Sequence, residues 1–211
     1  YDQLEVSLDP TPETWGNSDP KSVPYVAGTP KSVLDDVVVI PYNKPDEAET
    51  ILRKHARELA CIVIDLMPNR GGLIPATPEF VAMLKRVRED TGVLLVFDEV
   101  ITLRLALGGA QELFGIRPDL TATGKIIGGG FPVGAVAGSA EVMAVFVPGD
   151  GKPAVSHSGT FNANPMTMVA GEAAMQLLTQ DELDRIGALG DRARTGTAEV
   201  MQEIGLAGQV T

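Results

Sequence analysis

The sequence contains one cysteine and two histidines, and no long apolar run. The single cysteine, Cys61, excludes an internal disulfide and a cysteine-based zinc site. One cysteine is typical of a reducing compartment, so we expect a cytoplasmic protein. Two histidines are too few for a histidine metal cluster, and we expect no bound metal. A membrane-spanning helix needs roughly 18–20 consecutive apolar residues, which the sequence lacks.

Positive charge is also scarce. The 17 Lys and Arg residues are outnumbered by 28 Asp and Glu residues, which gives a formal net charge of −11 and a pI near 4.6. Nucleic-acid-binding proteins normally present a basic patch, and membrane-surface proteins often carry polybasic segments. We therefore expect neither a nucleic acid nor a membrane as partner. The hydrophobic fraction of 44% and the charged fraction of 21% are typical of a globular protein.

The two ends of the chain indicate part of a longer protein. The 211 residues start at Tyr1, without an initiator Met or a signal peptide. They stop at 208–211, in a short stretch that resembles the entry to a further strand. We expect a processed, truncated or partial chain of one domain, or one and a half.

Short apolar runs alternate with amphipathic segments along the chain. Residues 1–34 are rich in Pro, Asp, Ser and Thr, and we expect an irregular loop region there. Continuous apolar runs predict buried strands at 37–40, 61–66, 93–98, 120–123 and 132–138. Capping residues and helical periodicity predict helices at 45–60, 77–90, 139–146, 164–177 and 181–204. This alternation predicts an α/β fold, a mostly parallel sheet with helices on both faces.

Two charged residues next to apolar runs are candidates for a functional site. Asp98 follows the apolar run 93–97, and ligands of open α/β sheets bind beyond the carboxyl ends of strands. Its alternative role is a helix cap or a structural hydrogen bond. Lys125 lies among isoleucines and three glycines, where partial desolvation would make its amine nucleophilic. Its alternative is a surface lysine in a flexible loop. The glycines follow the lysine, so the segment is neither a P-loop nor a dinucleotide fingerprint.

The segment 158–165, Ser-Gly-Thr-Phe-Asn-Ala-Asn-Pro, leads into a predicted helix. Hydroxyls and free backbone N–H groups at a helix N-terminus suit an anion such as phosphate. Ordinary capping is the alternative, with Asn164 as N-cap and Pro165 as first helical residue. The following helix carries an apolar stripe of Met166, Val169, Ala173 and Leu177. We interpret its methionines as core residues rather than as part of a cofactor site.

Taken together, the motifs resemble those of class III aminotransferases, which belong to the pyridoxal-phosphate enzymes of fold type I. The subgroup that looks most similar is glutamate-1-semialdehyde 2,1-aminomutase with its transaminase relatives. The resemblance runs from about residue 33 to 211, and more loosely from residue 1. The motifs that carry it, in order, are Leu-Val-Phe-Asp-Glu-Val-Ile-Thr at 95–102, Gly-Gly-Ala-Gln at 108–111, Pro-Asp-Leu at 118–120, Gly-Lys-Ile-Ile-Gly-Gly-Gly at 124–130 and His-Ser-Gly-Thr-Phe-Asn-Ala-Asn-Pro at 157–165.

The resemblance implies the cofactor pyridoxal 5'-phosphate and assigns roles to individual residues. Lys125 matches the lysine that forms an aldimine with the cofactor aldehyde and then carries the proton. Asp98 matches the carboxylate that pairs with the pyridine nitrogen and keeps the ring an electron sink. Val100 matches the residue packed on the ring. Thr160, beside Gly159, matches a phosphate ligand that is usually donated across a dimer interface.

Other positions of the motif pattern differ or are weaker. Tyr1 is a candidate for the aromatic that stacks on the ring, although Asp2-Gln3 follows it where the family has His-Gly. Asp65-Leu66 stands where the family usually has Glu-Pro, and Thr102-Leu103-Arg104 looks one residue shorter than Thr-Gly-Phe-Arg. The resemblance divides the chain into the loop region 1–34, a partial cofactor-binding large domain at 35–178, and a C-terminal helix at 179–211. That helix leads toward an absent small domain.

The leading functional hypothesis is a transaminase that moves an amino group between an amino donor and a keto or aldehyde acceptor. Within enzymes the alternative is the aminomutase, in which donor and acceptor belong to one substrate. A second alternative is a truncated, non-catalytic fragment of the cofactor domain, and a nucleotide-binding α/β domain rests on fold analogy alone. We expect a homodimer or higher oligomer, because a partial domain exposes apolar surface.

Overall fold

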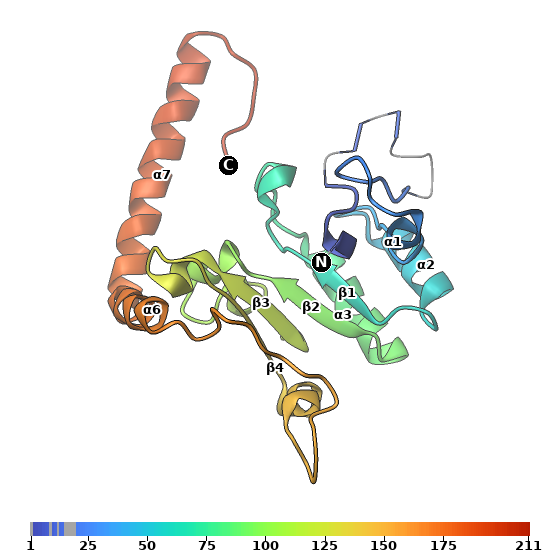
Figure 1. The fold of residues 1–211 in the computed structure, drawn as a ribbon. Helices are drawn as coiled ribbons and strands as arrows, with labels where there is room; N and C mark the ends of the chain where they lie inside the picture. The colour runs from blue at the N-terminus through green and yellow to red at the C-terminus, as the bar shows by residue number, and fades with distance from the viewer. Residues whose placement is uncertain (1, 9, 12, 15–19) are drawn as a thin grey trace. The chain divides into compact units, whose positions relative to one another are not determined.

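The structure is a computed structural model that describes residues 2–8, 10–11, 13–14 and 20–211. Tyr1, the candidate for stacking on the ring, lies outside the described residues. The described chain divides into two compact units. Unit 1 contains residues up to 60 together with 68–93, and unit 2 contains 61–67 together with 94–211. Figure 1 shows the ribbon coloured from the N-terminus to the C-terminus.

Unit 1 is built around two helices, α2 (Pro45–His55) and α3 (Pro78–Thr91). The predicted signals of α3 are confirmed, because Thr77 Oγ1 accepts a hydrogen bond from Phe80 N and Gly92 ends the helix in the left-handed conformation. The smaller elements of unit 1 are η1 (Asp2–Leu4), α1 (Lys31–Asp35) and η2 (Asn69–Gly71). The helix α1 overlaps the region 1–34 that the sequence predicted to be irregular, so that expectation was wrong for 31–34.

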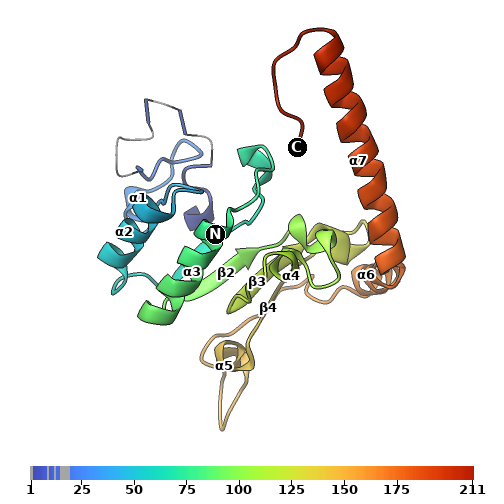
Figure 2. The same cartoon turned by 180° about the vertical axis from the view of Figure 1, so that it is seen from behind.

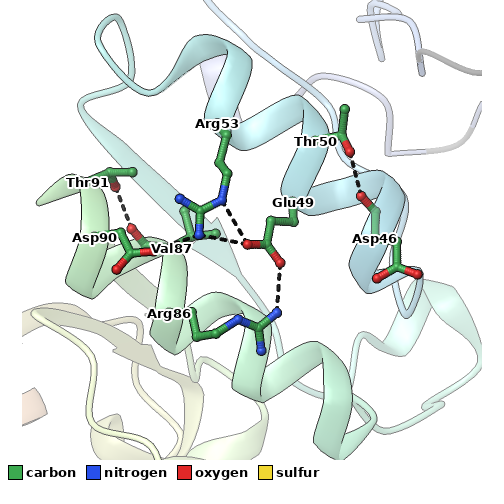
Figure 3. A network of polar contacts seen from close by, with 8 residues as sticks. All are labelled: Asp46, Glu49, Thr50, Arg53, Arg86, Val87, Asp90 and Thr91. Atoms are coloured by element: carbon green, nitrogen blue, oxygen red, sulfur yellow. Dashed lines mark hydrogen bonds and ion pairs between the residues drawn. The ribbon is translucent and has the colours of Figure 1, made fainter.

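Helices α2 and α3 pack against each other and share an ion-pair network on their surface. Figure 3 shows Glu49 between two arginines. Its Oε1 accepts a hydrogen bond from Arg53 at 2.8 Å, and its Oε2 accepts one from Arg86 at 2.7 Å. Arg53 also contacts Asp90 at 2.7 Å. The buried apolar side chains of the two helices are Ala48, Ile51, Leu52, Phe80, Val81, Met83, Leu84 and Val87.

The strand predicted at 37–40 is not formed. This segment is extended but belongs to no strand, because residues 38–40 have no backbone hydrogen-bond partner among the described residues. Val37 makes no strand pairing among the described residues: its N–H donates to Leu34 O, and its carbonyl accepts from the Ser22 side chain. A strand exists only when a neighbouring strand takes up its backbone groups, which an apolar run alone cannot ensure.

Unit 2 contains a four-stranded sheet in the order β1-β2-β3-β4. The strands are β1 (Cys61–Ile64), β2 (Leu94–Asp98), β3 (Leu120–Gly124) and β4 (Gly134–Gly138). Strands β1, β2 and β3 are parallel, and β4 pairs with β3 in the antiparallel direction. The prediction of an α/β fold with a mostly parallel sheet is confirmed. Since β1 to β3 run in the same direction, their carboxyl ends share one edge.

Short helices connect these strands, and two longer ones follow them. They are η3 (Thr102–Leu105), α4 (Ala110–Leu113), η4 (Lys125–Gly128), α5 (Ala140–Met143), η5 (Ala144–Phe146), α6 (Pro165–Leu177) and α7 (Gln180–Glu203). Figure 2, the view from behind, labels α4 and α5. As predicted, Asn164 caps α6: its Oδ1 accepts from Met166 N at 3.0 Å and Thr167 N at 3.4 Å.

The apolar stripe of α6 is exposed, which contradicts its interpretation as core. Met166 is 65% exposed, Val169 is 68% exposed and Leu177 is 74% exposed. Only the opposite side of the helix, with Thr167 and Gly171, is buried. Periodicity predicted the stripe, but nothing in the described chain covers it. No helix in the described part of the chain is long and apolar enough to cross a membrane.

Candidate active site at the carboxyl edge of the sheet

The carboxyl ends of β1, β2 and β3 bring Asp65, Asp98 and Lys125 together. The register pairs Ile64 with Phe97, so the next residues, Asp65 and Asp98, stand side by side. Asp98 is also paired with Ala122, and Lys125 follows β3 directly. Asp65 and Asp98 are 33 positions apart in the sequence, and Asp98 and Lys125 are 27 apart. They meet at one edge of the sheet because the parallel strands that precede them end there. This edge is where open α/β sheets bind ligands.

Asp98 is half-buried and keeps one carboxylate oxygen available. Its Oδ1 accepts a hydrogen bond from Val100 N at 3.0 Å, which fixes the side chain at the end of β2. Its Oδ2 has no hydrogen-bond partner among the described residues. The structural role that the sequence left open, a hydrogen bond for the next loop, therefore occupies only one oxygen. The other oxygen can therefore accept a hydrogen bond from a ligand.

Asp65 places a second carboxylate next to Asp98. Its Oδ1 accepts a hydrogen bond from Met67 N at 2.9 Å. The pKa of Asp65 is raised above its ordinary value, chiefly because burial disfavours the ionised form, and the negative charges of Asp98 and Glu99 act in the same direction. The Met67 N–H and the charge of Lys125 oppose this rise. The pKa of Asp65 therefore depends on the charges of Asp98, Glu99 and Lys125.

Lys125 is an exposed lysine in a strained backbone conformation. It is the first residue of η4, and its φ of +48° lies in the left-handed region that favours glycine. Non-glycine residues persist in this region only where the surrounding structure stabilises them. Such residues are often found at functional sites. The lysine thus lies in a short 3-10 turn directly beyond β3, and its side chain is exposed.

Val100 lies against the residue that precedes the lysine. A Cβ atom added to Gly124 would meet Val100 Cγ1 at 3.5 Å and the carbonyl oxygen of Val133 at 3.3 Å. Gly124 is itself buried. The absent side chain at Gly124 therefore allows Val100 to pack next to the Lys125 turn, where it can provide an apolar surface for a flat ligand.

Glu99 is a functional-site neighbour that the sequence analysis did not single out. It is 1% exposed, and its carboxylate accepts hydrogen bonds from Ala110 N at 2.8 Å, from Gln111 N at 3.0 Å and from Gln111 Nε2 at 3.2 Å. Gln111 Nε2 also donates to Thr121 Oγ1 on β3. These bonds anchor the loop after β2 to the sheet. The signal in the sequence is an acid next to Asp98 followed by Gly-Gly-Ala-Gln, which offers free N–H groups.

The turn η3 after β2 buries a polar group without satisfying it. Thr102 is 1% exposed, and its Oγ1 has no hydrogen-bond partner in the part of the chain that the structure describes. Buried hydroxyls are normally hydrogen-bonded. The loop that the sequence analysis expected to differ in length from the family pattern is thus also the place where the described residues leave a polar atom unpaired.

Gly159 and Thr160 do not join this cluster. Both are exposed, on the loop that precedes the Asn164 cap of α6, and neither makes a hydrogen bond to Asp98 or Lys125 within the described residues. The turn is local: Asn162 N donates to Gly159 O at 3.0 Å. The structure therefore brings Asp98, Val100 and Lys125 together and leaves the predicted phosphate ligand on the surface.

The fold and the site define an α/β enzyme domain with an amine and a carboxylate at the carboxyl edge of a parallel sheet. A family model described as "Aminotransferase class-III" matches residues 19–204. The chain therefore belongs to the class III aminotransferase family.

Individual relatives agree with this assignment. Glutamate-1-semialdehyde 2,1-aminomutase from Desulfotalea psychrophila is 42% identical over 160 residues, covering 75% of this chain and 36% of the relative. The enzyme of the same name from Pyrobaculum aerophilum is 38% identical over 207 residues, covering 97% of this chain and 47% of the relative. Among solved structures, an omega-transaminase from Sphaerobacter thermophilus superposes with a TM-score of 0.94 at 50% identity, covering all of this chain and 48% of that one.

A glutamate-1-semialdehyde aminomutase from Pseudomonas aeruginosa PAO1 shares the fold, with a TM-score of 0.80 at 23% identity. The superposition covers all of this chain and 46% of the aminomutase. The chain spans about half the length of the relatives it matches. The fold is thus that of fold-type I pyridoxal-phosphate enzymes, represented by roughly half of their length.

Proposed function

We propose that this chain is the part of a pyridoxal-phosphate-dependent transaminase that holds the reactive lysine. The enzyme moves an amino group between an amino donor and a keto or aldehyde acceptor. One observation carries the proposal: in a class III family member, Lys125 and Asp98 meet at the carboxyl edge of the sheet. The omega-transaminase that is 50% identical over the whole chain supports the reaction class.

The residues present fit the cofactor. Asp98 has a carboxylate oxygen without a partner in the described chain, half-buried beside Asp65, where a protonated ring nitrogen can be bound. Val100 supplies an apolar surface next to the Gly124 backbone. Lys125 provides an exposed amine on the η4 turn. A solved transaminase with PLP bound is 42% identical over 99% of this chain.

When bound, the cofactor supplies an electron sink for the substrate carbon. The chain's own residues supply binding, orientation and proton transfer. Asp98 would keep the ring nitrogen protonated, because a carboxylate beside that nitrogen favours its charged form. Lys125 Nζ would accept the proton released from the substrate carbon and would carry it during the transfer. The main-chain N–H of Val100 keeps Asp98 oriented throughout.

We also propose a homodimer or higher oligomer in which Thr160 acts on the neighbouring copy. The exposed position of Gly159 and Thr160 supports this arrangement, because a surface loop can reach a second subunit. The Thr160 hydroxyl lies in the loop before α6, where a hydroxyl donor suits a phosphate oxygen. The exposed apolar stripe of α6 is a further surface that an assembly can cover.

The aminomutase reaction is the second candidate. The curated relatives that match at 38–44% identity carry the name glutamate-1-semialdehyde 2,1-aminomutase. The two reactions use the same lysine and carboxylate and differ in whether donor and acceptor are one molecule. An assay separates them: an aminomutase converts glutamate-1-semialdehyde alone, whereas a transaminase needs an amine and a carbonyl acceptor.

The first experiment adds pyridoxal phosphate to the purified chain and records the visible absorption spectrum. The proposal predicts a band of lysine-bound cofactor that Lys125→Ala abolishes and that Lys152→Ala, which changes an exposed lysine, leaves unchanged. Asp98→Asn keeps the bond to Val100 N but removes the charge, and it should weaken cofactor binding. A chain without a band, or a band that is indifferent to Lys125→Ala, would show a non-catalytic fragment.

A further inference from the structure

The turn that begins with Lys125 packs backbone against backbone on α6. A Cβ atom added to Gly171 of α6 would overlap the carbonyl oxygen of Ile127. On the other side of the contact, a Cβ added to Gly129 would overlap the carbonyl oxygen of Ala170. Each glycine therefore allows an approach that no other residue permits, and the two contacts are reciprocal.

A third glycine completes this contact, which we call the glycine seam (Gly128, Gly129 and Gly171). Gly128 is buried, and a Cβ added to it would lie 2.7 Å from Val133 Cγ1 and 3.8 Å from Thr167 Cγ2. Thr167, on the same side of α6 as Gly171, is 5% exposed. The buried side of α6 is thus the side that faces η4, while its apolar stripe is free.

The glycine seam lies directly after the strained lysine. Lys125 has a φ of +48°, and such a conformation persists only where the surroundings hold it. Before the lysine, Gly124 fits against Val100 and the Val133 carbonyl. After it, the seam fits against α6. The backbone of Lys125 is therefore held between the sheet and a helix, with glycines at both contacts.

We propose that Gly171 is a positioning residue that holds the Lys125 amine in place relative to Asp98, through the contact of α6 with η4. This inference rests on the proposed function of Lys125. An added methyl group at Gly171 meets a backbone carbonyl, which cannot rotate away as a side chain can. Either α6 or η4 must move, and Lys125 is part of η4.

The test compares Gly171→Ala with Gly187→Ala, a control in the exposed helix α7 where an added Cβ meets nothing within 4 Å. Each variant is incubated with pyridoxal phosphate and reduced with borohydride, and the modified lysines are located by mass spectrometry. Because a displacement of about 1 Å lowers reactivity up to roughly a hundredfold, we expect attachment at Lys125 to fall by ~10- to 100-fold in Gly171→Ala. Attachment at the exposed Lys152 and the behaviour of Gly187→Ala should not change.

A second readout does not depend on the cofactor. In chains labelled with ¹⁵N-lysine, the backbone amide resonance of Lys125 should shift in Gly171→Ala and stay in place in Gly187→Ala. Gly128→Ala serves as a milder variant, because its added methyl meets the Val133 side chain and not a carbonyl. It should give a smaller shift and a smaller loss of attachment. Circular dichroism shows whether each variant is folded.

The outcomes separate the two proposals. If the wild-type chain does not attach the cofactor preferentially at Lys125, the proposed function of this chain fails, and the Lys125 resonance still decides the positioning role. If Gly171→Ala is folded and leaves both the Lys125 attachment and the Lys125 resonance unchanged, the positioning role is wrong. An equal loss of attachment at Lys125 and Lys152 would also overturn it, since that loss is not specific to η4.

Discussion

Asp65, directly after β1, and Asp98, the last residue of the neighbouring parallel strand β2, have the same local structure. In each, Oδ1 accepts the N–H of the residue two positions later, from Met67 at 2.9 Å and from Val100 at 3.0 Å. Side-by-side carboxylates repel each other when both are ionised. The edge of the sheet is therefore a place where negative charge is concentrated, balanced in part by Lys125.

The first prediction concerns Asp65→Asn. The pKa of Asp65 is raised in the folded chain, so the folded state binds a proton more tightly than the unfolded state. Stability is then lost as the pH rises from the ordinary value of 3.8 through the raised pKa, and the loss persists at neutral pH. Asparagine keeps the bond to Met67 N without the charge. We expect a higher free energy of unfolding for Asp65→Asn at pH 7 and no gain near about pH 3.

Urea denaturation at several pH values measures this difference. The control is Asp150→Asn, which changes an exposed aspartate and should show no such pH-dependent gain. A stability gain of Asp65→Asn that is the same at both pH values would contradict the electrostatic explanation.

The second prediction concerns the ion-pair network of Figure 3. Hydrogen bonds from Arg86 and Arg53 lower the pKa of Glu49, so its contribution to stability is present above the ordinary pKa and is lost as the pH falls through the lowered one. Glu49→Gln should reduce the free energy of unfolding at pH 7 by about 1 kcal/mol or less. Added salt should shrink the effect, because surface charges are screened.

Chemical denaturation at low and high ionic strength checks the Glu49 prediction. Glu199→Gln, on the exposed surface of α7, is the matched control and should change stability little. A salt-independent loss in Glu49→Gln would point to lost packing between α2 and α3 in place of lost charge pairing.

The third prediction compares the two glycines that flank α4, one before its first residue and one after its C-cap. Gly109 has a φ of +76° and Gly115 a φ of +61°. Any other residue at either position would have a strained backbone. A Cβ at Gly109 would also collide with the buried Glu99 carboxylate, whereas one at Gly115 meets nothing within 4 Å. Gly115→Ala should destabilise by about 1–2 kcal/mol. Gly109→Ala should destabilise by about 1–3 kcal/mol more, as overpacking does.

Thermal unfolding of both variants gives the difference. Removing the obstacle in the double variant Glu99→Ala/Gly109→Ala should make the two substitutions less than additive, because they share one contact. Equal losses in Gly109→Ala and Gly115→Ala would mean that the Glu99 contact does not constrain the loop.

The fourth prediction concerns the exposed stripe of α6. Val169 and Leu177 are 68% and 74% exposed, and we expect them to contribute to self-association. The double variant Val169→Gln/Leu177→Gln should lower the average mass in sedimentation equilibrium. Val200→Gln, at a 55% exposed position of α7, is the control and should leave the mass unchanged. A wild-type chain that is monomeric at all concentrations would refute the prediction.

Local signals in the sequence determined much of the fold. Thr77, Asn164 and Gly92 mark helix boundaries through backbone hydrogen bonds or φ angles that involve only neighbouring residues. The apolar runs of β1, β2 and β3 predicted strands, since a continuous run suits a strand buried on both faces. The motifs around Asp98 and Lys125 identified the family before any contact was known, and the matched region of 19–204 confirms it.

Only the tertiary structure decided which of these residues meet. The sequence could not show that Asp65 stands beside Asp98, because that depends on the register of two strands joined by a long connection. It could not show that, among the described residues, 37–40 has no partner strand and the α6 stripe has no cover. Apolar patterning does not specify the surface that buries a segment. The hydrogen bonds of Glu99 and the close contact at the glycine seam could not be predicted from the sequence either. A buried charge and a close backbone approach are defined by the neighbours that folding brings together, and those neighbours are distant in the chain.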